Sequence, residues 1–304
     1  MRTIYLGTSS FAAAVLDRLA ASSHRPALVV TRPDRPRGRG QRVQPPPVAV
    51  RAHELGLDVI QPERLHEPEP LERIAAVEPE VACVCAYGVL IKEPLLSAYE
   101  MLNVHPSLLP RWRGAAPVER AIMAGDAQTG VSIMRLTEGL DSGPVCLQEA
   151  VAIEADDDYG TLAARLEHLG GDLLVQALDE RPPFAEQDDA EATYASKIEA
   201  ADRALDGRRS AAELERTVRA LRPHIGARVA LPNGDFIGVL AARVVDAGPE
   251  PGRVKADGDR LLLGAADGAL ELTVIRPPGG RPMATSDWLR GRPDERLTDF
   301  AIAT

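Results

Sequence analysis

The stretch LNVHPSLLPRWRGAAPVERAIMAGD, residues 102–126, together with LTEGLDSGP, residues 136–144, decides the fold that we expect of this chain. Asn103 and His105 lie two residues apart at the end of an apolar–polar alternation, so on a strand their side chains share one face. Asp141 follows in a loop flanked by glycines. An acid that reaches the imidazole would fix its tautomer and favour its charged form. An amide, an imidazole and a carboxylate together suit a reaction in which a carbonyl oxygen gains negative charge while an amine loses a proton.

Strand and helix signals alternate through the first part of the chain. Short apolar runs predict strands over residues 3–6, 27–31, 58–61, 81–87, 101–105, 129–136 and 145–153. Helical periodicity predicts helices over residues 11–21, 47–55, 71–77, 118–124 and 159–178. This alternation indicates an α/β fold with a Rossmann-like, doubly wound and mostly parallel sheet. In such sheets ligands bind beyond the carboxyl ends of the strands, where Asn103 and His105 would lie.

The composition changes near Arg181. The residues that follow are polar, acidic and begin with prolines, which is typical of an interdomain linker. A predicted helix over residues 211–221 precedes short runs broken by Gly and Pro, at 227–231, 236–245, 252–255, 260–263 and 269–275. Such runs predict a small, OB-like antiparallel β-barrel. We therefore expect a first domain over residues 1–186, a linker over 187–203 and a barrel domain over 204–304.

Composition excludes several classes of protein. The 304 residues are 45% hydrophobic, and no apolar run approaches the roughly 20 residues that span a bilayer. The N-terminus lacks the long apolar core of a signal peptide. Cys83, Cys85 and Cys146 form neither a CxxC pair nor a Cys/His cluster, so we expect no disulfide framework and no metal. The sequence predicts a cytoplasmic monomer that contacts no membrane, and it holds no GxGxxG or Walker loop.

Arginines gather in residues 31–44, TRPDRPRGRGQRVQ, although the whole chain has a net charge of -10. Five arginines against Asp34 leave four net positive charges in this segment: Arg32, Arg35, Arg37, Arg39 and Arg42. The prolines and glycines disfavour a helix. The segment is therefore either a solvated, mobile loop or a flexible arm that grips a polyanion, because guanidinium groups bind phosphates bidentately and stack on bases.

Several segments resemble the folate-dependent formyltransferases. NVHPSLLPRWRGAAP with the downstream LDSGP carries the resemblance. Supporting segments run along nearly the whole chain: IYLGTSSFAAAVLDRL, TRPDRPRGRG, VCAYGVLI, TGVSIMRLTEGLDSG and TYASKI. HPSLLP is common to the superfamily, whereas PDRPRGRG, WRGAAP and a C-terminal barrel together are similar to its members that act on methionyl-tRNA.

The resemblance implies transfer of the formyl group of 10-formyltetrahydrofolate to the α-amino group of methionine on initiator methionyl-tRNA, for translation initiation. It implies that Asn103, His105 and Asp141 are catalytic. It implies a folate pocket formed by Ala86, Tyr87, Gly88, Leu90 and Ile91 together with Ser107, Leu108, Leu109 and Pro110. It also implies that the acceptor end of the tRNA is bound by Arg35, Arg37, Arg39 and Arg42, while the C-terminal barrel supports the acceptor stem.

Two positions depart from the pattern of the members that act on tRNA, and alternatives stay open. Pro106 stands where those members often carry Gly or Phe, and RPHIG at residues 222–226 differs from a turn rich in Pro and Trp. A formyltransferase acting on a nucleotide sugar or glycinamide ribonucleotide explains the catalytic groups but not the arginines or the barrel. A non-catalytic RNA-binding protein explains only the arginines, and the net charge disfavours it. For His105 alone, a core histidine capped by a backbone carbonyl is the alternative.

Overall fold

The computed structural model describes residues 1–37, 42–291 and 299–302. These residues form two compact units. Unit 1 consists of Met1–Pro117, Gln128–Ala152 and Ala163–Ala195. Unit 2 consists of Val118–Ala127, Ile153–Leu162 and Ser196–Thr304. Two short stretches that are flanked in sequence by segments of unit 1, Val118–Ala127 and Ile153–Leu162, therefore belong to the unit that holds the C-terminal region.

Unit 1 is built on a seven-stranded sheet in the order β10-β9-β7-β6-β1-β2-β5. Its strands are β1 (Thr3–Gly7), β2 (Leu28–Val30), β5 (Val59–Ile60), β6 (Val81–Cys85), β7 (Glu100–His105), β9 (Gln128–Arg135) and β10 (Val145–Ala152). The pairs from β7 through β6, β1 and β2 to β5 are parallel, whereas β9 pairs antiparallel with β7 and β10 pairs antiparallel with β9. The prediction of a mostly parallel α/β sheet is confirmed.

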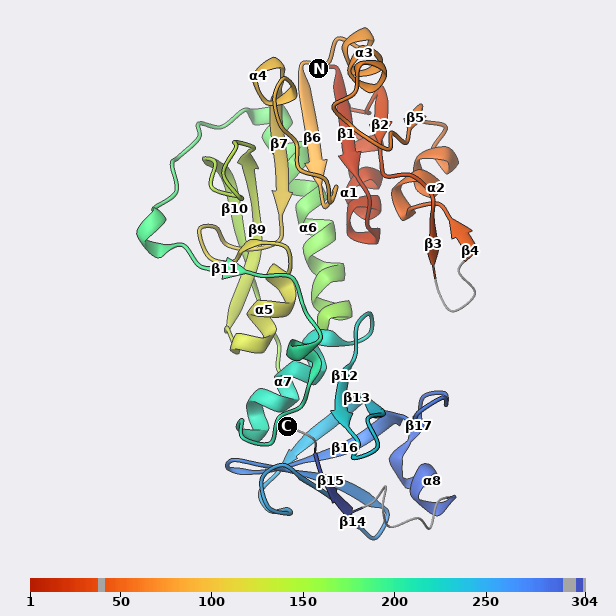
Figure 1. Ribbon diagram of the computed structural model, residues 1–304. Helices are drawn as coiled ribbons and strands as arrows, with labels where there is room; N and C mark the ends of the chain where they lie inside the picture. The colour runs from red at the N-terminus through yellow and green to blue at the C-terminus, as the bar shows by residue number, and fades with distance from the viewer. Residues whose placement is uncertain (38–41, 292–298, 303–304) are drawn as a thin grey trace. The chain divides into compact units, whose positions relative to one another are not determined.

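Helices cover this sheet. They are α1 (Ser10–Ala20), α2 (Pro47–Glu54), α3 (Pro68–Ala76), α4 (Leu95–Ala98) and the long α6 (Tyr159–Glu180), which crosses behind the strands in Figure 1. All residues of β1 and β6 are buried, as expected of strands that are covered on both faces. At Gly170 of α6 a Cβ atom would lie 2.7 Å from Cγ1 of Val104, so the glycine allows the helix to approach β7 closely.

Two local predictions differ from the structure. The strand predicted over residues 81–87 ends at Cys85, because Ala86 adopts a left-handed backbone with φ 42°. The arginine-rich segment was expected to be irregular, but it forms a short antiparallel hairpin of β3 (Arg35–Arg37) and β4 (Arg42–Gln44). A proline is tolerated in β3 because a two-stranded ribbon leaves one edge of each strand unpaired. Residues 38–41, including Arg39, lie outside the described residues.

The C-terminal region of unit 2 is a curled antiparallel sheet in the order β12-β13-β16-β15-β14-β18, with β17 paired to β16. Its elements are β12 (Ala227–Ala230), β13 (Phe236–Val245), β14 (Arg253–Asp257), β15 (Arg260–Ala265), β16 (Gly268–Arg276), β17 (Met283–Ala284), β18 (Asp299–Ala301), α7 (Ala211–Leu221) and α8 (Thr285–Arg290). Register shifts between Val239 and Ala242 bend β13. The predicted small antiparallel barrel-like sheet is confirmed.

One buried core holds unit 2 together. Leu214 and Val218 of α7 pack with Ile237, Leu263 and Leu272 of the curled sheet. The helix begins with a capping box, in which the side chains of Ser210 and Glu213 satisfy each other's backbone N–H groups.

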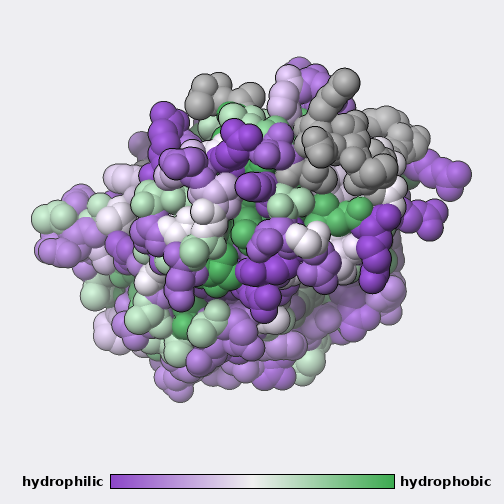
Figure 2. All heavy atoms as spheres, turned by 90° about the horizontal axis from the view of Figure 1, so that it is seen from below, coloured by the Kyte–Doolittle hydropathy of each residue, from purple (hydrophilic) through white to green (hydrophobic). Residues whose placement is uncertain are grey.

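The surface of the molecule, seen from below, is mostly hydrophilic with small, separate hydrophobic areas (Figure 2).

Candidate active site

The carboxyl end of β7 carries the first two predicted catalytic residues. Asn103 pairs in register with Val84 of β6 and with Met134 of β9, and His105 pairs with Ser132 of β9. Both side chains belong to buried residues, with 8% of Asn103 and 4% of His105 exposed. Among the described residues no group hydrogen-bonds to the carboxamide of Asn103, so both its NH₂ and its oxygen are available to a bound molecule.

His105 is held from two sides. Its Nε2 lies 2.9 Å from the backbone carbonyl oxygen of Trp112, and its Nδ1 lies 3.7 Å from Oδ2 of Asp141. A carbonyl oxygen only accepts hydrogen bonds, so Nε2 must carry a proton in every state of the ring. In the neutral ring Nδ1 is then the unprotonated nitrogen. The carbonyl cap that was the alternative for His105 is therefore present, and it directs the reactive nitrogen towards Asp141.

The loop after β9 brings Asp141 to this histidine. The side chain of Asp141 is 15% exposed, and its Oδ2 accepts a hydrogen bond of 2.9 Å from the backbone N–H of Gly114. Gly114 has φ +120°, and a Cβ atom there would lie 2.8 Å from the carbonyl oxygen of Ala195. Glycine is therefore required at position 114, and the carboxylate is anchored by an N–H that a side chain at this position would displace.

The turn after His105 is fixed by side chains of the neighbouring strands β9 and β10. Ser132 donates to the carbonyl oxygen of Ser107 over 2.6 Å and accepts from the backbone N–H of Leu109 over 3.1 Å. Gln148 donates to the carbonyl oxygen of Leu109 over 2.9 Å and to the hydroxyl of Ser132 over 2.8 Å. Ser107 and Leu109 are buried, whereas Leu108 and Pro110 are partly exposed.

The second predicted folate segment leaves the neighbouring strand β6. Ala86 and Gly88 have positive φ values of 42° and 73° and are exposed. Between them Tyr87 is buried; its carbonyl oxygen accepts from the hydroxyl of Thr8 over 2.7 Å, and burial raises the pKa of its phenol to about 12. Leu90 is 64% exposed, and Ile91 is buried. Because β6 and β7 are parallel neighbours, both predicted folate segments lie at one end of the sheet.

The predicted tRNA-binding arginines lie in the hairpin. Arg35 and Arg42 are exposed, and Arg35 makes an ion pair of 3.5 Å with Glu63. Arg37 pairs with Arg42 through the backbone, and Arg39 lies outside the described residues. Within the described part of the chain, no hydrogen bond or ion pair joins these arginines to Asn103, His105 or Asp141. The structure thus brings the three catalytic candidates together.

Four residues that shape the site were missed. Trp112 supplies the carbonyl, Gly114 supplies the amide, and Gln187 and Thr193 bind the loops that carry them. WRGAAP and TYASKI contain three of the four and were noticed only as family segments. Trp112 and Gly114 act through backbone groups, and the side chains of Gln187 and Thr193 bind partners distant in sequence, so no local chemical pattern identifies these roles.

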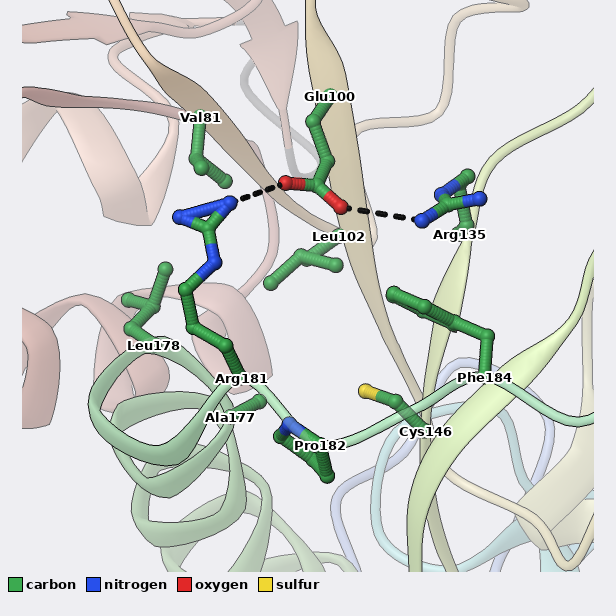
Figure 3. A pocket seen from close by; sticks show the side chains of 10 residues that line it. All are labelled: Val81, Glu100, Leu102, Arg135, Cys146, Ala177, Leu178, Arg181, Pro182 and Phe184. Carbon is green, nitrogen blue, oxygen red and sulfur yellow. Dashed lines mark hydrogen bonds and ion pairs between the residues drawn. The ribbon is translucent and has the colours of Figure 1, made fainter.

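A pocket of about 250 Å³ lies at the opposite end of the strands (Figure 3). Glu100, the first residue of β7, accepts there from Arg135 over 3.2 Å and from Arg181 over 2.8 Å. Arg135 also lies over the ring of Phe184, 4.1 Å from its centre. His105 lies five residue positions along β7 from Glu100, or roughly 16 Å at about 3.3 Å per position. The charged groups of this pocket pair with one another, and it is distinct from the candidate active site.

Other chemistries find little support in the part of the chain that the structure describes. No three His, Cys, Asp or Glu residues gather there in a way that would hold a metal ion. Nor is any helix among those residues long and apolar enough to cross a membrane. Burial raises the pKa of both Cys83 and Cys85 to about 12, so these thiols stay protonated near neutral pH and are poor nucleophiles.

Comparisons with known proteins agree with this geometry. A family model described as formyl transferase matches residues 1–178, and one described as formyl transferase, C-terminal domain, matches residues 197–293. The chain belongs to the formyltransferase family. It is 44% identical over 301 residues to the methionyl-tRNA formyltransferase of Halorhodospira halophila, covering 96% of each chain. It is 43% identical over 297 residues to that of Dechloromonas aromatica, again covering 96% of each.

Solved structures share the formyltransferase fold. WlaRD, a sugar 3N-formyl transferase, superposes with a TM-score of 0.65 at 13% identity, over 90% of this chain and 97% of that one. HypX of Aquifex aeolicus in complex with tetrahydrofolic acid superposes with a TM-score of 0.63 at 19% identity, over 95% of this chain. This chain spans about half the length of HypX, 47%. At such identities these two structures support the fold alone.

Proposed function

We propose that this formyltransferase transfers the formyl group of 10-formyltetrahydrofolate to the α-amino group of methionine on initiator methionyl-tRNA. The observation that carries the chemistry is the arrangement of a buried imidazole between a carbonyl cap and a carboxylate, beside the Asn103 carboxamide, to which no described residue hydrogen-bonds. The acceptor is supported by the full-length similarity to methionyl-tRNA formyltransferases.

Asn103 and His105 stabilise the oxygen of the formyl group as it becomes negative. The NH₂ group of Asn103 donates to this oxygen, and the charged ring of His105 donates through Nδ1, because Nε2–H is committed to Trp112. Asp141, 3.7 Å from Nδ1, balances the positive charge of the ring. These donors are fixed before substrate binds, which is what makes them effective in the transition state.

A proton must leave the attacking amine. Asp141, or a water that it orients, accepts this proton, the new bond joins the amine nitrogen to the formyl carbon, and the bond from that carbon to the folate nitrogen breaks as the folate nitrogen gains a proton. The step is a direct transfer, since Cys83 and Cys85 are buried with strongly raised pKa values. No covalent intermediate with the protein forms.

The binding assignments are part of the same proposal. Residues 86–91 and 107–110 hold the folate, and the hairpin arginines Arg35, Arg37, Arg39 and Arg42 hold the acceptor end of the tRNA. The exposure of Arg35 and Arg42 supports the second assignment. The domains over residues 1–186 and 204–304, joined by the linker 187–203, act together as a cytoplasmic monomer, with the C-terminal barrel contacting the tRNA.

An acceptor panel tests the proposal. Purified protein is given 10-formyltetrahydrofolate with initiator methionyl-tRNA, a nucleotide amino sugar or glycinamide ribonucleotide, and formylated product is measured. We expect product only with methionyl-tRNA, and a rate that falls steeply as salt rises, because contacts with phosphates release counterions. Transfer to a small amine but not to the tRNA would move this chain to another branch of the family.

A further inference from the structure

Residues 187–195, which we call the brace segment, are the first half of the predicted linker 187–203 and pack within unit 1. The brace segment binds both loops that carry the partners of His105. At its start, Nε2 of Gln187 donates to the carbonyl oxygens of Asp141 over 2.9 Å and of Gly143 over 2.6 Å. Two hydrogen bonds from one amide therefore hold the backbone of the loop that carries the Asp141 carboxylate.

The carboxamide of Gln187 has a single consistent orientation. Its Oε1 accepts from Nε of Arg113 over 3.0 Å, and a guanidinium group only donates. The NH₂ group must then face the two carbonyl oxygens, as the hydrogen bonds require. Arg113 is itself buried, with 3% of its side chain exposed, and is paired with Asp189 of the brace segment over 2.8 Å. Gln187 thus joins the segment around residue 113 to the Asp141 loop.

The other end of the brace segment holds the second loop. The hydroxyl of Thr193 accepts from the backbone N–H of Trp112 over 2.9 Å, and its carbonyl oxygen accepts from Arg113 N–H over 2.9 Å. Next to it β11 (Tyr194–Ala195) pairs in parallel with β8 (Arg113–Gly114). The Trp112 carbonyl that caps His105 and the Gly114 amide that binds Asp141 are both positioned by these contacts.

Asp141 needs such support. Its φ of 46° is a left-handed backbone conformation, which a residue other than glycine holds only where the surroundings impose it. Gly114 N–H binds its carboxylate, and Gln187 binds its carbonyl oxygen. Without the Gln187 amide, the carbonyl oxygens of Asp141 and Gly143 both lose a hydrogen-bond donor, and the loop has fewer restraints against relaxing to a commoner backbone conformation.

We propose that Gln187 is a positioning residue, which sets the distance between the Asp141 carboxylate and His105 by holding the backbone of residues 141–143. This inference rests on the proposed function, since it assigns Gln187 a role in the same transfer. Misplacing a catalytic group by about 1 Å costs roughly 100-fold in rate. We therefore expect Gln187→Leu to lower kcat by about 10- to 100-fold, with the KM of each substrate within about twofold of wild type.

Paired variants separate positioning from packing. Gln187→Glu keeps the size and the acceptor for Arg113 but loses the NH₂ donor, so it should lose as much kcat as Gln187→Leu. Gln176→Leu is the matched control, because Gln176 is an exposed glutamine of unit 1 whose amide binds only Glu180 among the described residues. Its kcat should equal that of wild type. A Gln187→Glu protein with wild-type kcat would overturn the proposal even if the leucine variant fails to fold.

A double-mutant cycle with Asp141→Asn measures whether Gln187 acts through Asp141. The kcat of each variant is determined with whichever amine the wild type accepts. If Gln187 acts through Asp141, Gln187→Leu should change kcat by less than about threefold in the Asp141→Asn background. Equal losses in both backgrounds would mean that Gln187 acts independently, and an undiminished kcat in the single variant would mean that it does not act at all. Either result overturns the positioning role. Absence of methionyl-tRNA formylation by wild type would instead overturn the proposed function.

Discussion

The Asp141 loop and the β3–β4 hairpin both carry charged groups that we assign to the reaction, yet they are held in opposite ways. The side chain of Asp141 is 15% exposed, and backbone and amide groups bind both its carboxylate and its carbonyl oxygen. Arg35 and Arg42 are exposed, and the ion pair of Arg35 with Glu63 spans 3.5 Å. Groups that act on reacting atoms are fixed out of water, whereas groups that meet a large polyanion stay in water until it arrives.

This difference has an energetic basis. An exposed ion pair such as Arg35–Glu63 contributes about 0–1 kcal/mol, so an arginine leaves it for a phosphate at little cost. A buried hydrogen bond to a charged group contributes about 1.5–3 kcal/mol and is expensive to leave unmade. Substitutions in the two regions should therefore differ in size and in the kinetic constant that they change.

The largest effect is expected at Asp141. Asp141→Asn keeps an acceptor oxygen for the N–H of Gly114 but removes the charge beside His105, so kcat should fall by about 100- to 1000-fold. Folate affinity, measured by fluorescence titration, should not change. Asp172→Asn, which breaks a surface ion pair with Arg18, serves as the control. A loss of kcat no greater at Asp141 than at Asp172 would contradict the assignment.

Gly114→Ala should have the next largest effect. The new Cβ atom would lie 2.8 Å from the carbonyl oxygen of Ala195, and φ +120° strains any residue except glycine. We expect a loss of about 1–3 kcal/mol in the free energy of unfolding, measured in urea, and a lower kcat because the N–H moves away from Asp141. Gly56→Ala serves as the control. Gly56 has φ +66° and open space around it, so alanine there adds backbone strain but no steric clash. Equal kcat in both variants would count against the anchoring role of Gly114.

Arg42→Ala should act on tRNA binding only. Arg42 is exposed, and no hydrogen bond between described residues joins it to Asn103, His105 or Asp141, so we expect a higher KM for methionyl-tRNA and an unchanged KM for folate. Loss of one phosphate contact should reduce the slope of log affinity against log salt by about 1. Arg39→Ala, outside the described residues, is expected to behave in the same way. An unchanged salt slope in both variants would remove the hairpin from the tRNA interface.

The smallest effect on formyl transfer is expected from alkylation of the thiols in β6 and β10. Since the pKa values of Cys83 and Cys85 are raised to about 12, both remain neutral thiols until the pH approaches that value. Burial also raises the pKa of Cys146, but this residue is only partly buried, so a reagent reaches it more easily. Iodoacetamide at pH 8 should therefore label native protein at Cys146 first, as read by peptide mass spectrometry, with no loss of formyl transfer. Labelling of Cys85 ahead of Cys146 would show that β6 is less protected than described.

The sequence predicted most of the fold because the signals are local. Alternating strands and helices, and the apolar run over residues 81–85, require only periodicity and burial. The i, i+2 spacing of Asn103 and His105 likewise determined their common face. The strands β3 and β4 were not predicted because they contain Pro36 and charged residues. Their sequence therefore lacks the alternation of apolar and polar residues that indicates a strand.

The sequence supplied the candidate side chains of the site, Asn103, His105 and Asp141, but not the groups that bind them. The Trp112 carbonyl, the Gly114 amide and the brace segment act through backbone groups or through partners distant in sequence. Residues 187–195 look like a linker because they are polar and acidic, and nothing local shows that Gln187 binds the Asp141 loop. Long-range pairing of polar groups depends on the tertiary structure, which composition does not reveal.

The most direct test of the account compares single-turnover formylation of initiator methionyl-tRNA by wild type and by His105→Gln, with folate binding measured on both. The glutamine amide reaches the position of Nε2 and is still able to donate to the Trp112 carbonyl, but the side chain carries no ring nitrogen beside Asp141. We predict that the rate constant falls by about 100- to 1000-fold while folate binding is kept. A variant that binds folate and transfers formyl groups at the wild-type rate would contradict the catalytic role of His105 and with it the mechanism.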